Sequence, residues 1–396
     1  MTADSAILDG KVAIVGIGHT EYRKRGELAH RGTYSLACEA IANACADAGI
    51  SPSSIDGYSG YAYEAVEPLR IAAAFGAPKL GYAGMVWGGG GGGVLGAVVN
   101  ASMALVCGYA DYVVIYRSLT MSQATGRFGQ LEVEKALTGD LSEDLTFSGP
   151  YGLLSPAQVF ALNARRHMHR YGTTIDQLGE IAVNARRMAA TNPDARFREP
   201  LTLQQHHDSR MIADPLRLLD CCMESDGAAA VVLTRTDRAA DLAQSPVYVR
   251  SSAMGADFRY SSRLSVSDDD FASAAQTSLA EQLFARAAIR PDDIDVALLY
   301  DHFTPMVLMS LEDFGFCAKG EGGPFVADGQ IGLTGTLPLN PHGGHLAEVY
   351  LHGMNHILEA TRQLRGTAVN QVPSADLALV GGAGGVNPTT GCVLSR

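Results

Sequence analysis

The sequence predicts an α/β fold made of two related halves, and three observations support this prediction. Residues 50–56 (ISPSSID) match residues 289–295 (IRPDDID) in every Ile, Pro and final Asp. A second pair links residues 110–115 (ADYVVI) with residues 375–380 (ADLALV) in the same order. Strand-like runs alternate with helical patterns in each copy. An ordered repeat of this kind indicates a duplicated unit, and the alternation predicts mixed or mainly parallel sheets with helices packed on them.

The first half begins with a short β-branched run at residues 11–17 (KVAIVGI), which predicts a strand. Residues 33–48 form an alanine-rich helical pattern that Gly49 closes. Residues 57–62 predict a second extended segment. The sequence after the first strand, GIGHTE, fails the dinucleotide fingerprint because Glu21 stands where the third glycine belongs.

A six-glycine run at residues 88–93 joins an apolar strand to an apolar helix that extends to Cys107. We expect a tight turn there, which leaves room for a ligand and presents helix-start amides to an anion or a carbonyl oxygen. The run lacks the Lys-Ser/Thr pair of a phosphate loop, which argues against nucleotide hydrolysis.

The second half repeats this order. It contains a helix at residues 276–288, a strand at 296–300 and a glycine-opened helix at 343–364. Between the halves, residues 118–215 form an excursion with two helical patterns and a loop-rich stretch, after which DGAAAVVLT returns to a buried strand of the first half. We therefore expect an N-terminal half at residues 1–240 and a C-terminal half at 241–396.

Composition restricts the classes of function. The net charge of −12, without a basic block, argues against nonspecific nucleic-acid binding. No stretch has the length of a membrane span, and the start lacks the pattern of a secretion signal. Seven cysteines without paired spacing predict neither a disulfide framework nor a metal knuckle. These features together predict a soluble, cytoplasmic protein.

Residues 339–357 (LNPHGGHLAEVYLHGMNHI) are the most informative stretch. Apolar residues recur on one face of a predicted helix that includes Tyr350, so this phenol is either a core residue or a catalytic group. The stretch also contains four histidines. His352 and His356 would lie one turn apart with Glu348 a further turn back, which is a possible metal spacing. Because HGMNH lacks the glutamate of HExxH, we expect no metal.

Several phrases together identify a family resemblance. They are GYADYVVIYRS, ARRHMHRYGTT, IADPLRLLDCC, DGAAAVVL, YDHFTP, LEDFGFCAKGEGG and LPLNPHGGHLAEVYLHGMNHI. Over essentially its whole length the chain resembles the thiolase superfamily. It looks most like the thiolase-like lipid-transfer-protein branch, which includes sterol-carrier-type thiolases and bacterial steroid side-chain aldolases. The resemblance implies a thiolase-like, five-layered αβαβα fold with an inserted loop and helix region.

The chain departs from the thiolase pattern at the reacting positions. The nucleophilic Cys of a thiolase falls at about Gly90, and its second Cys falls near Leu379. The Asn of the Asn-Glu-Ala-Phe motif corresponds to Tyr300, and the His of the Gly-His-Pro motif corresponds to Tyr350. Without a thiolate at these positions, the pattern excludes ordinary thiolysis. It suits the aldolase members of the branch, in which two tyrosines replace the thiolase machinery.

Such enzymes cleave a β-hydroxyacyl-CoA into a ketone and a shortened acyl-CoA. The resemblance implies a 17-hydroxy steroid C22 acyl-CoA as substrate, with a 17-keto steroid and propionyl-CoA as products. We expect Tyr350 and Tyr300 to share proton transfer and oxyanion support, without an assignment of the base. His302, His342 and His345 are candidates to tune or relay. Glycines next to the site are candidate substrate contacts, namely Gly90, Gly343, Gly344 and Gly384.

The resemblance also implies partners. We expect a core homodimer and a small DUF35-like partner of the zinc-ribbon and OB-fold type, together forming a heterotetramer. No bound cofactor is expected, since CoA is part of the substrate and any zinc would belong to the partner. Two other readings remain open: a noncatalytic thiolase-like subunit that binds acyl-CoA or lipid, and a decarboxylating or acyl-transferring enzyme that uses the histidines.

Overall fold

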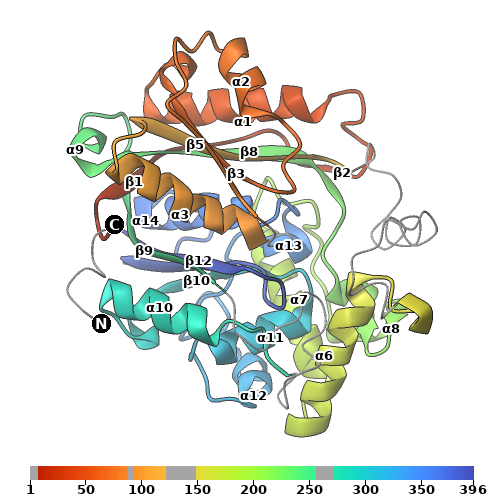
Figure 1. Cartoon of the computed structure of the whole chain (residues 1–396). Helices are drawn as coiled ribbons and strands as arrows, with labels where there is room; N and C mark the ends of the chain where they lie inside the picture. The colour runs from red at the N-terminus through yellow and green to blue at the C-terminus, as the bar shows by residue number, and fades with distance from the viewer. Residues whose placement is uncertain (1–7, 88–91, 122–148, 256–271) are drawn as a thin grey trace.

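The computed structural model describes residues 8–87, 92–121, 149–255 and 272–396 (Figure 1). Within these residues, most strands join one continuous sheet in the order β10-β11-β12-β9-β1-β8-β5-β3-β4, with β2 beside β8. They are β1 (Val12–His19), β2 (Arg23–Lys24), β3 (Gly57–Tyr61), β4 (Tyr82–Val86), β5 (Tyr112–Thr120), β8 (Ser225–Arg235), β9 (Val247–Gly255), β10 (Val296–Leu299), β11 (Leu377–Gly381) and β12 (Thr389–Ser395). A separate small hairpin is formed by β6 (Met211–Ala213) and β7 (Leu216–Arg217).

The described helices have the following bounds: α1 (Thr33–Ala48), α2 (Pro68–Ala74), α3 (Gly93–Val106), α6 (Pro156–Tyr171), α7 (Ile175–Ala189), α8 (Leu203–Asp208), α9 (Thr236–Ala239), α10 (Thr277–Ala287), α11 (Thr304–Asp313), α12 (Gly322–Ala327), α13 (Gly344–Ala347) and α14 (Met354–Arg365). Most strands and helices that the sequence predicted are present within a few residues of the expected bounds. The first helix ends as expected, because Gly49 adopts φ 75° and its N–H bonds back to the last turn.

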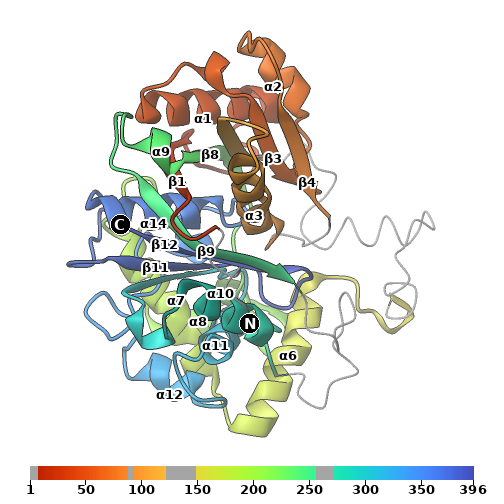
Figure 2. The same ribbon diagram turned by 60° about the vertical axis from the view of Figure 1, so that its left-hand side comes forward.

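The elements stack in five layers. Figures 1 and 2 show α1 and α2 over the outer face of the first half-sheet, and α10 and α11 below the second. Helices α3 and α14 lie between the half-sheets and contact strands of both. A buried apolar cluster fills this central layer, and two others lie under the outer helices. The predicted αβαβα arrangement is therefore confirmed, and its sheet is mixed.

The two half-sheets meet at a short joint. Strands β1 and β9 pair antiparallel through two residue pairs, Ala13 with Tyr248 and Ile14 with Val247. The helices of the central layer therefore carry most of the contact between the halves. Within the residues that the structure describes, every helix is too short or too polar to cross a lipid bilayer.

The repeat is visible in equivalent hydrogen bonds in the two halves. Asp56 accepts the backbone N–H groups of Asp111 and Tyr112 at 2.9 and 3.0 Å. The Asp295 carboxylate accepts those of Asp376 and Leu377 at 2.8 and 2.9 Å. Each aspartate thus ties the first repeated motif to the second within its own half. The strands that follow these motifs pair in parallel, β3 with β5 in the first half and β10 with β11 in the second. We call these two sets of hydrogen bonds, one around Asp56 and one around Asp295, the aspartate clamps.

One predicted element is wrong. Residues 343–364 do not form one helix, because α13 ends at Ala347 and α14 begins at Met354. The intervening segment contains His352 at φ 54° and Gly353 at φ 90°, left-handed conformations that a right-handed helix cannot contain. The apolar spacing that suggested a continuous helix instead reflects burial on every side.

The excursion packs against the second half. Helix α7 contacts α11, α12 and α13. After α7, the backbone N–H groups of Arg196 and Phe197 donate to the carbonyls of Glu348 and Ala347 at 3.0 and 2.9 Å. The excursion therefore braces the irregular segment that carries Tyr350. The expected boundary between the halves at residue 240 stays a prediction.

Candidate active site

Two buried tyrosines meet at the centre of the molecule. Tyr300 follows the carboxyl end of β10, and Tyr350 lies in the irregular segment before α14. The Tyr300 hydroxyl donates to the Tyr350 hydroxyl at 3.1 Å, and the two rings stand nearly perpendicular at 83°. Their exposed fractions are 2% and 8%. The structure thus brings together the two tyrosines that the sequence singled out, although they are far apart along the chain.

The neighbours of Tyr300 fix its position. Asn340 forms two hydrogen bonds with the backbone of Leu299, at 3.0 and 2.9 Å. The Asp301 carboxylate accepts the backbone N–H groups of His345 and Leu346 at 2.8 and 3.2 Å. This approach requires a glycine at position 344, where φ is 62° and a Cβ would lie 2.1 Å from the Asp301 carboxylate.

Tyr350 is held by its backbone. Its N–H donates to Ser225 Oγ at 3.0 Å, and this hydroxyl donates in turn to the Tyr350 carbonyl at 3.1 Å. Ser225 begins β8, so the first residue of a first-half strand fixes the position of the second-half tyrosine. The left-handed residues His352 and Gly353 then reverse the chain into α14. Strained backbone of this kind persists where the surroundings enforce it, and it is common at functional sites.

The surroundings of the pair are apolar. Met223 and Ala383 pack directly with the two tyrosines. Five partly buried side chains pack against these residues, namely Leu119, Met121, Phe197, Cys222 and Val386. The start of α3 is also close, since a Cβ on Gly353 would touch both the Tyr300 ring and Val94 at 3.5 Å. On this side, a reacting group at the hydroxyls would therefore meet carbon and sulfur atoms and a helix start.

Burial and the direction of the hydrogen bond make the tyrosines unequal. Burial raises the pKa of both phenols well above the usual value. For Tyr300, the neighbouring Tyr350 raises the pKa further. For Tyr350, the hydrogen bond from Tyr300 and the charge of Arg117 act in the opposite direction and lower the pKa. Of the two, Tyr350 is therefore the easier phenol to deprotonate, and Tyr300 is the donor.

The three candidate histidines occupy different places. The ring of His345 lies 4.4 Å from that of Tyr300 and 5.2 Å from that of Tyr350. His302 flanks Tyr300 at 5.1 Å, and burial lowers the pKa of His302 to about 4. His342 is hydrogen-bonded to His356 at 3.0 Å. The structure therefore brings His345 and His302 to the pair, whereas His342 has no ring contact with either tyrosine.

Behind the tyrosines, Asp301, His345 and His356 bring potential ligand atoms within 4.8 Å of one another. His345 Nδ1 and His356 Nε2 each lie 3.3 Å from Asp301 Oδ1. Two backbone amides already bind this carboxylate, which gives it an anchoring role. The absence of a metal stays a prediction. The alternative His352–His356–Glu348 spacing is wrong, because His352 precedes α14 and does not share a helix with His356.

The candidate glycines have structural reasons for their positions. Gly343 has φ 105° and packs on α7, where a Cβ would meet Ala189 at 2.8 Å. Gly344 makes room for Asp301. Gly384 follows Ala383, and a Cβ there would meet Ala274 at 2.8 Å. Gly90 lies outside the described residues. Contact of these glycines with substrate stays a prediction.

Sequence reasoning missed other residues at the site. Cys222 packs against the pair, although its place in the sequence gave it no role in the expected site. On the other side His352 contacts Tyr350, Tyr61 contacts His352, and Arg117 lies over the Tyr61 ring. No motif marks them. The sequence signal that could have found them is the arginine within the apolar strand YVVIYRSLT, because a buried cation requires a nearby partner.

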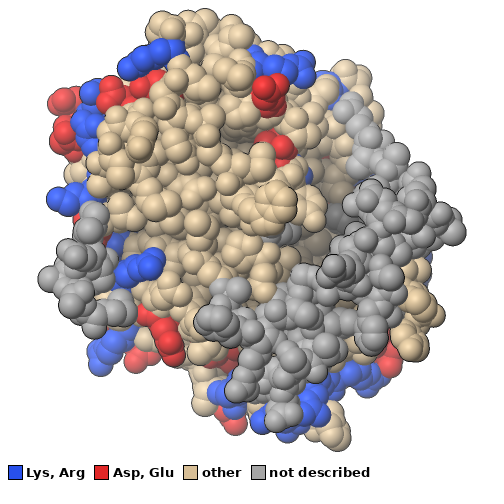
Figure 3. Space-filling view, viewed as in Figure 1, with Lys and Arg blue, Asp and Glu red and all other residues tan. Residues whose placement is uncertain are grey.

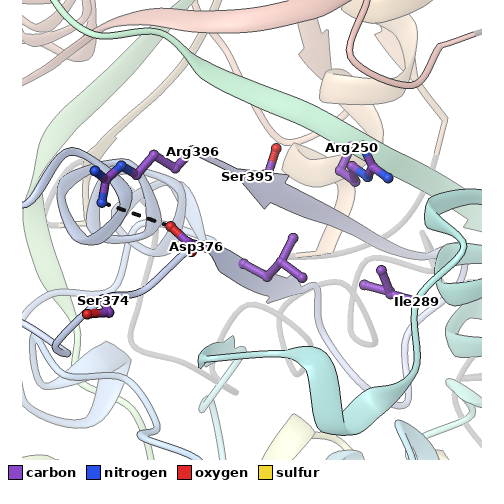
Figure 4. A pocket seen from close by; sticks show the side chains of 7 residues that line it. Arg250, Ile289, Ser374, Asp376, Ser395 and Arg396 are labelled. Atoms are coloured by element: carbon purple, nitrogen blue, oxygen red, sulfur yellow. Dashed lines mark ion pairs between the residues drawn. The ribbon is translucent and has the colours of Figure 1, made fainter.

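A surface hollow lies elsewhere. Its volume is about 700 Å³, and Figure 4 shows Arg250, Asp376 and Arg396 among its lining residues. Asp376 lies just before β11, whereas Tyr300 follows the opposite end of the parallel neighbour β10. The hollow is therefore at the far end of the sheet from the tyrosines and has no part in their chemistry.

Comparison with known proteins agrees with the fold and the repeat. Residues 12–237 match the family model described as "Thiolase, N-terminal domain", and residues 259–396 match "Thiolase C-terminal domain-like". The chain is 42% identical to a 17-hydroxy-3-oxo-4-pregnene-20-carboxyl-CoA lyase of Mycobacterium tuberculosis, over 98% of this chain and 100% of the relative. It is also 42% identical to a steroid side-chain-cleaving aldolase of Thermomonospora curvata, over 98% and 99%.

Among solved structures, the chain is similar to one described as an Ltp2-ChsH2(DUF35) aldolase. The TM-score is 0.90 at 41% identity, covering 98% of this chain and 99% of that one. Full-length similarity at this level, with both family models in the expected order, establishes the relationship. The chain belongs to the thiolase superfamily, in its thiolase-like steroid-aldolase group.

Proposed function

We propose that this protein is a carbon–carbon lyase that cleaves the side chain of a steroid acyl-CoA by a retro-aldol reaction. The substrate is a 17-hydroxy steroid with a C22 acyl-CoA side chain, and the products are a 17-keto steroid and propionyl-CoA. The observation that carries the proposal is the hydrogen-bonded pair of Tyr300 and Tyr350 in a buried apolar setting. The lyase and aldolase names of relatives that share the full chain length support it.

The reaction is balanced without another reactant. A base removes the proton of the β-hydroxyl, and the oxygen forms the ketone as the Cα–Cβ bond breaks. The electron pair of that bond moves into the thioester, which becomes an enolate. A proton then returns to Cα and gives propionyl-CoA. The protein must therefore accept one proton, stabilise the enolate oxygen and deliver one proton.

The asymmetry of the pair divides these roles. Burial raises the pKa of Tyr350, but Tyr300 and Arg117 oppose this rise, and Tyr350 accepts the hydrogen bond of the pair, so we assign Tyr350 as the base. Tyr300 remains protonated and supplies a donor to the developing enolate. His345 lies against both rings and keeps them in place. Both phenols act directly on substrate atoms, and no acyl group is attached to the protein.

The nearby cysteine does not provide an alternative nucleophile. Cys222 packs beside the tyrosines, but burial and then Cys221 raise the pKa of its thiol well above the usual value. A protonated thiol is a poor nucleophile. The surrounding Met223, Leu119 and Phe197 are better suited to contacting the rings of an apolar acyl group than to acyl transfer.

We further propose the assembly. The solved relative named as a DUF35 aldolase supports a DUF35-type partner, which would hold any zinc. We propose that the core homodimer forms through the surface made by the edge strand β4 and the adjoining helix α3 (Figure 2). Met85 and Trp87 are 62% and 89% exposed there. Figure 3 shows few charged side chains over α3, as expected for a surface that meets a second copy.

The test of function is direct. The chain is co-expressed with a DUF35-type partner and given the 17-hydroxy C22 acyl-CoA, and the 17-keto steroid and propionyl-CoA are measured by mass spectrometry. We expect equal amounts of both products, and a loss of turnover in Tyr350→Phe. Tyr58→Phe is the matched control, since Tyr58 is fully buried with an unpartnered hydroxyl among the described residues. Tight binding of the substrate without cleavage would contradict the proposal and favour a binding subunit.

A further inference from the structure

A buried cation lies beside the tyrosine pair. Arg117 belongs to β5, and its side chain is 6% exposed. One terminal nitrogen donates to the Tyr63 carbonyl at 2.6 Å and to Glu64 at 3.3 Å. Among the described residues, Nε has no hydrogen-bond partner. Because desolvating a guanidinium is costly, a position of this kind requires compensation from nearby groups.

Glu64 supplies only part of that compensation. Its side chain is 4% exposed, and its carboxylate also accepts Ser118 N–H at 2.8 Å and Val66 N–H at 2.9 Å. The carboxylate is therefore shared among several donors. Arg117 is left with a second electrostatic neighbour, the ring of Tyr61, whose centroid lies 5.6 Å from the guanidinium carbon.

A continuous set of contacts joins this cation to Tyr350. The Tyr61 hydroxyl is hydrogen-bonded to His352 Nδ1. The His352 ring stands edge-on to Tyr350, with centroids 4.9 Å apart. His352 is held in the left-handed conformation at φ 54°, so its ring is placed there at a cost in backbone strain. Burial and then Arg117 lower the pKa of His352, which keeps this imidazole neutral.

We propose that Arg117 is a positioning residue that makes Tyr350 the proton acceptor, acting through Tyr61 and His352. This inference rests on the proposed retro-aldol function and adds the group that selects the base. A tyrosinate that forms at position 350 is stabilised by the nearby guanidinium, while the intervening neutral rings exclude water. Glu64 holds the guanidinium in place through the contact at 3.3 Å.

Other groups also face Tyr350. Among the described residues they include Tyr300 after β10, Cys222 before β8, His345 in α13, Tyr63 after β3 and His352 in the same segment. Burial and Cys222 raise the pKa of Tyr350, and so does Tyr63, whereas Tyr300 and Arg117 lower it. In the part of the chain that the structure describes, Arg117 is the full positive charge that lowers the pKa of Tyr350, so its removal is the most informative change.

The first test measures kcat and KM against pH. In Arg117→Met/Glu64→Gln both charges are removed, so no unpaired buried ion remains. The pH at which kcat rises should move up by about one unit or more, with KM little changed, because a cation that favoured tyrosinate is lost. Arg117→Lys keeps the charge and should keep the profile near that of the wild type. The matched control is Arg365→Met/Asp47→Asn, which removes another largely buried ion pair, at 2.8 Å.

The second test does not depend on turnover. A fluorinated, more acidic tyrosine is placed at position 350, and its ionisation is followed by fluorine NMR in the otherwise wild-type chain and in the Arg117→Met/Glu64→Gln background. We expect its titration to move to higher pH in that background and to stay in place in the control. An unchanged titration in folded protein overturns the role of Arg117. If the titration differs between the two backgrounds as expected but the wild-type chain never cleaves the substrate, the result contradicts the proposed function alone.

Discussion

Replacing Tyr300 by Phe removes the hydroxyl that donates to Tyr350 and leaves the shape of the ring unchanged. The hydrogen bond is 3.1 Å long and buried, and it becomes charge-assisted when Tyr350 ionises. A bond of this class contributes about 1.5–3 kcal/mol, which corresponds to roughly one to two pKa units for Tyr350. Below that pKa, the active tyrosinate should become about 10- to 100-fold scarcer.

Tyr300→Phe also removes a donor to the enolate oxygen. Loss of one such donor lowers kcat by a factor of about 10²–10³. Because the two effects act on the same step, we expect kcat/KM to fall by at least about 10²-fold and the rising limb of the pH profile to move upward. Tyr350→Phe should lose activity at every pH, since it removes the base itself.

The assay follows propionyl-CoA release by the complex with its partner up to the highest pH at which the wild-type complex stays folded, because burial raises the pKa of both phenols, and each variant is checked for folding by circular dichroism. Tyr58→Phe controls for the loss of a buried phenol hydroxyl away from the site. A Tyr300→Phe variant within about threefold of the wild type, with an unmoved profile, would refute the division of roles, since a lost donor should cost far more.

The other predictions concern stability. Burial raises the pKa of Glu348 to about 8, so the folded state retains a proton that the unfolded chain loses near pH 4.5. Stability should therefore fall as pH rises through that window, and Glu348→Gln should remove the part of the fall due to this residue and gain a few kcal/mol at pH 9 in urea unfolding, while Glu359, whose pKa burial raises to about 7, keeps its own part. Gly344→Ala should lose about 2–4 kcal/mol, since its Cβ would collide with Asp301 at a left-handed position; a loss under 1 kcal/mol would contradict this reason. Asp56→Asn and Asp295→Asn should each cost about 1–2 kcal/mol, and a large difference between them would show that the clamps are not equivalent.

The layers and the repeat could be predicted because their signals are local. The motif ending in Asp56 recurs at Asp295 with the same spacing to a strand, and Gly49 marks the end of the first helix. Alignment with a family pattern also placed Tyr300 and Tyr350 at corresponding catalytic positions, and the structure brings these hydroxyls within hydrogen-bond distance. A pattern of residue types was sufficient for these features.

The irregular segment before α14 could not be predicted in this way. Its spacing fits a helix, but its conformation depends on Ser225, Asp301 and residues of the excursion that are distant in sequence. Helical periodicity reports which positions are buried, and in this segment every position is buried. The roles of Arg117 and His352 were hidden for the same reason, since their partners come from other strands and loops.

The aspartate clamps also relate two tyrosines at the centre of the molecule. Tyr61 is the fifth residue after Asp56, and Tyr300 is the fifth residue after Asp295, so the two tyrosines occupy equivalent positions of the repeat. Tyr350 stands between them, bonded to Tyr300 directly and reached from Tyr61 through His352. The two halves thus place a phenol at the same position of the repeat, where the thiolase pattern has Asn in the second half. In this chain one of these phenols bonds to Tyr350, and the other lies under the guanidinium of Arg117.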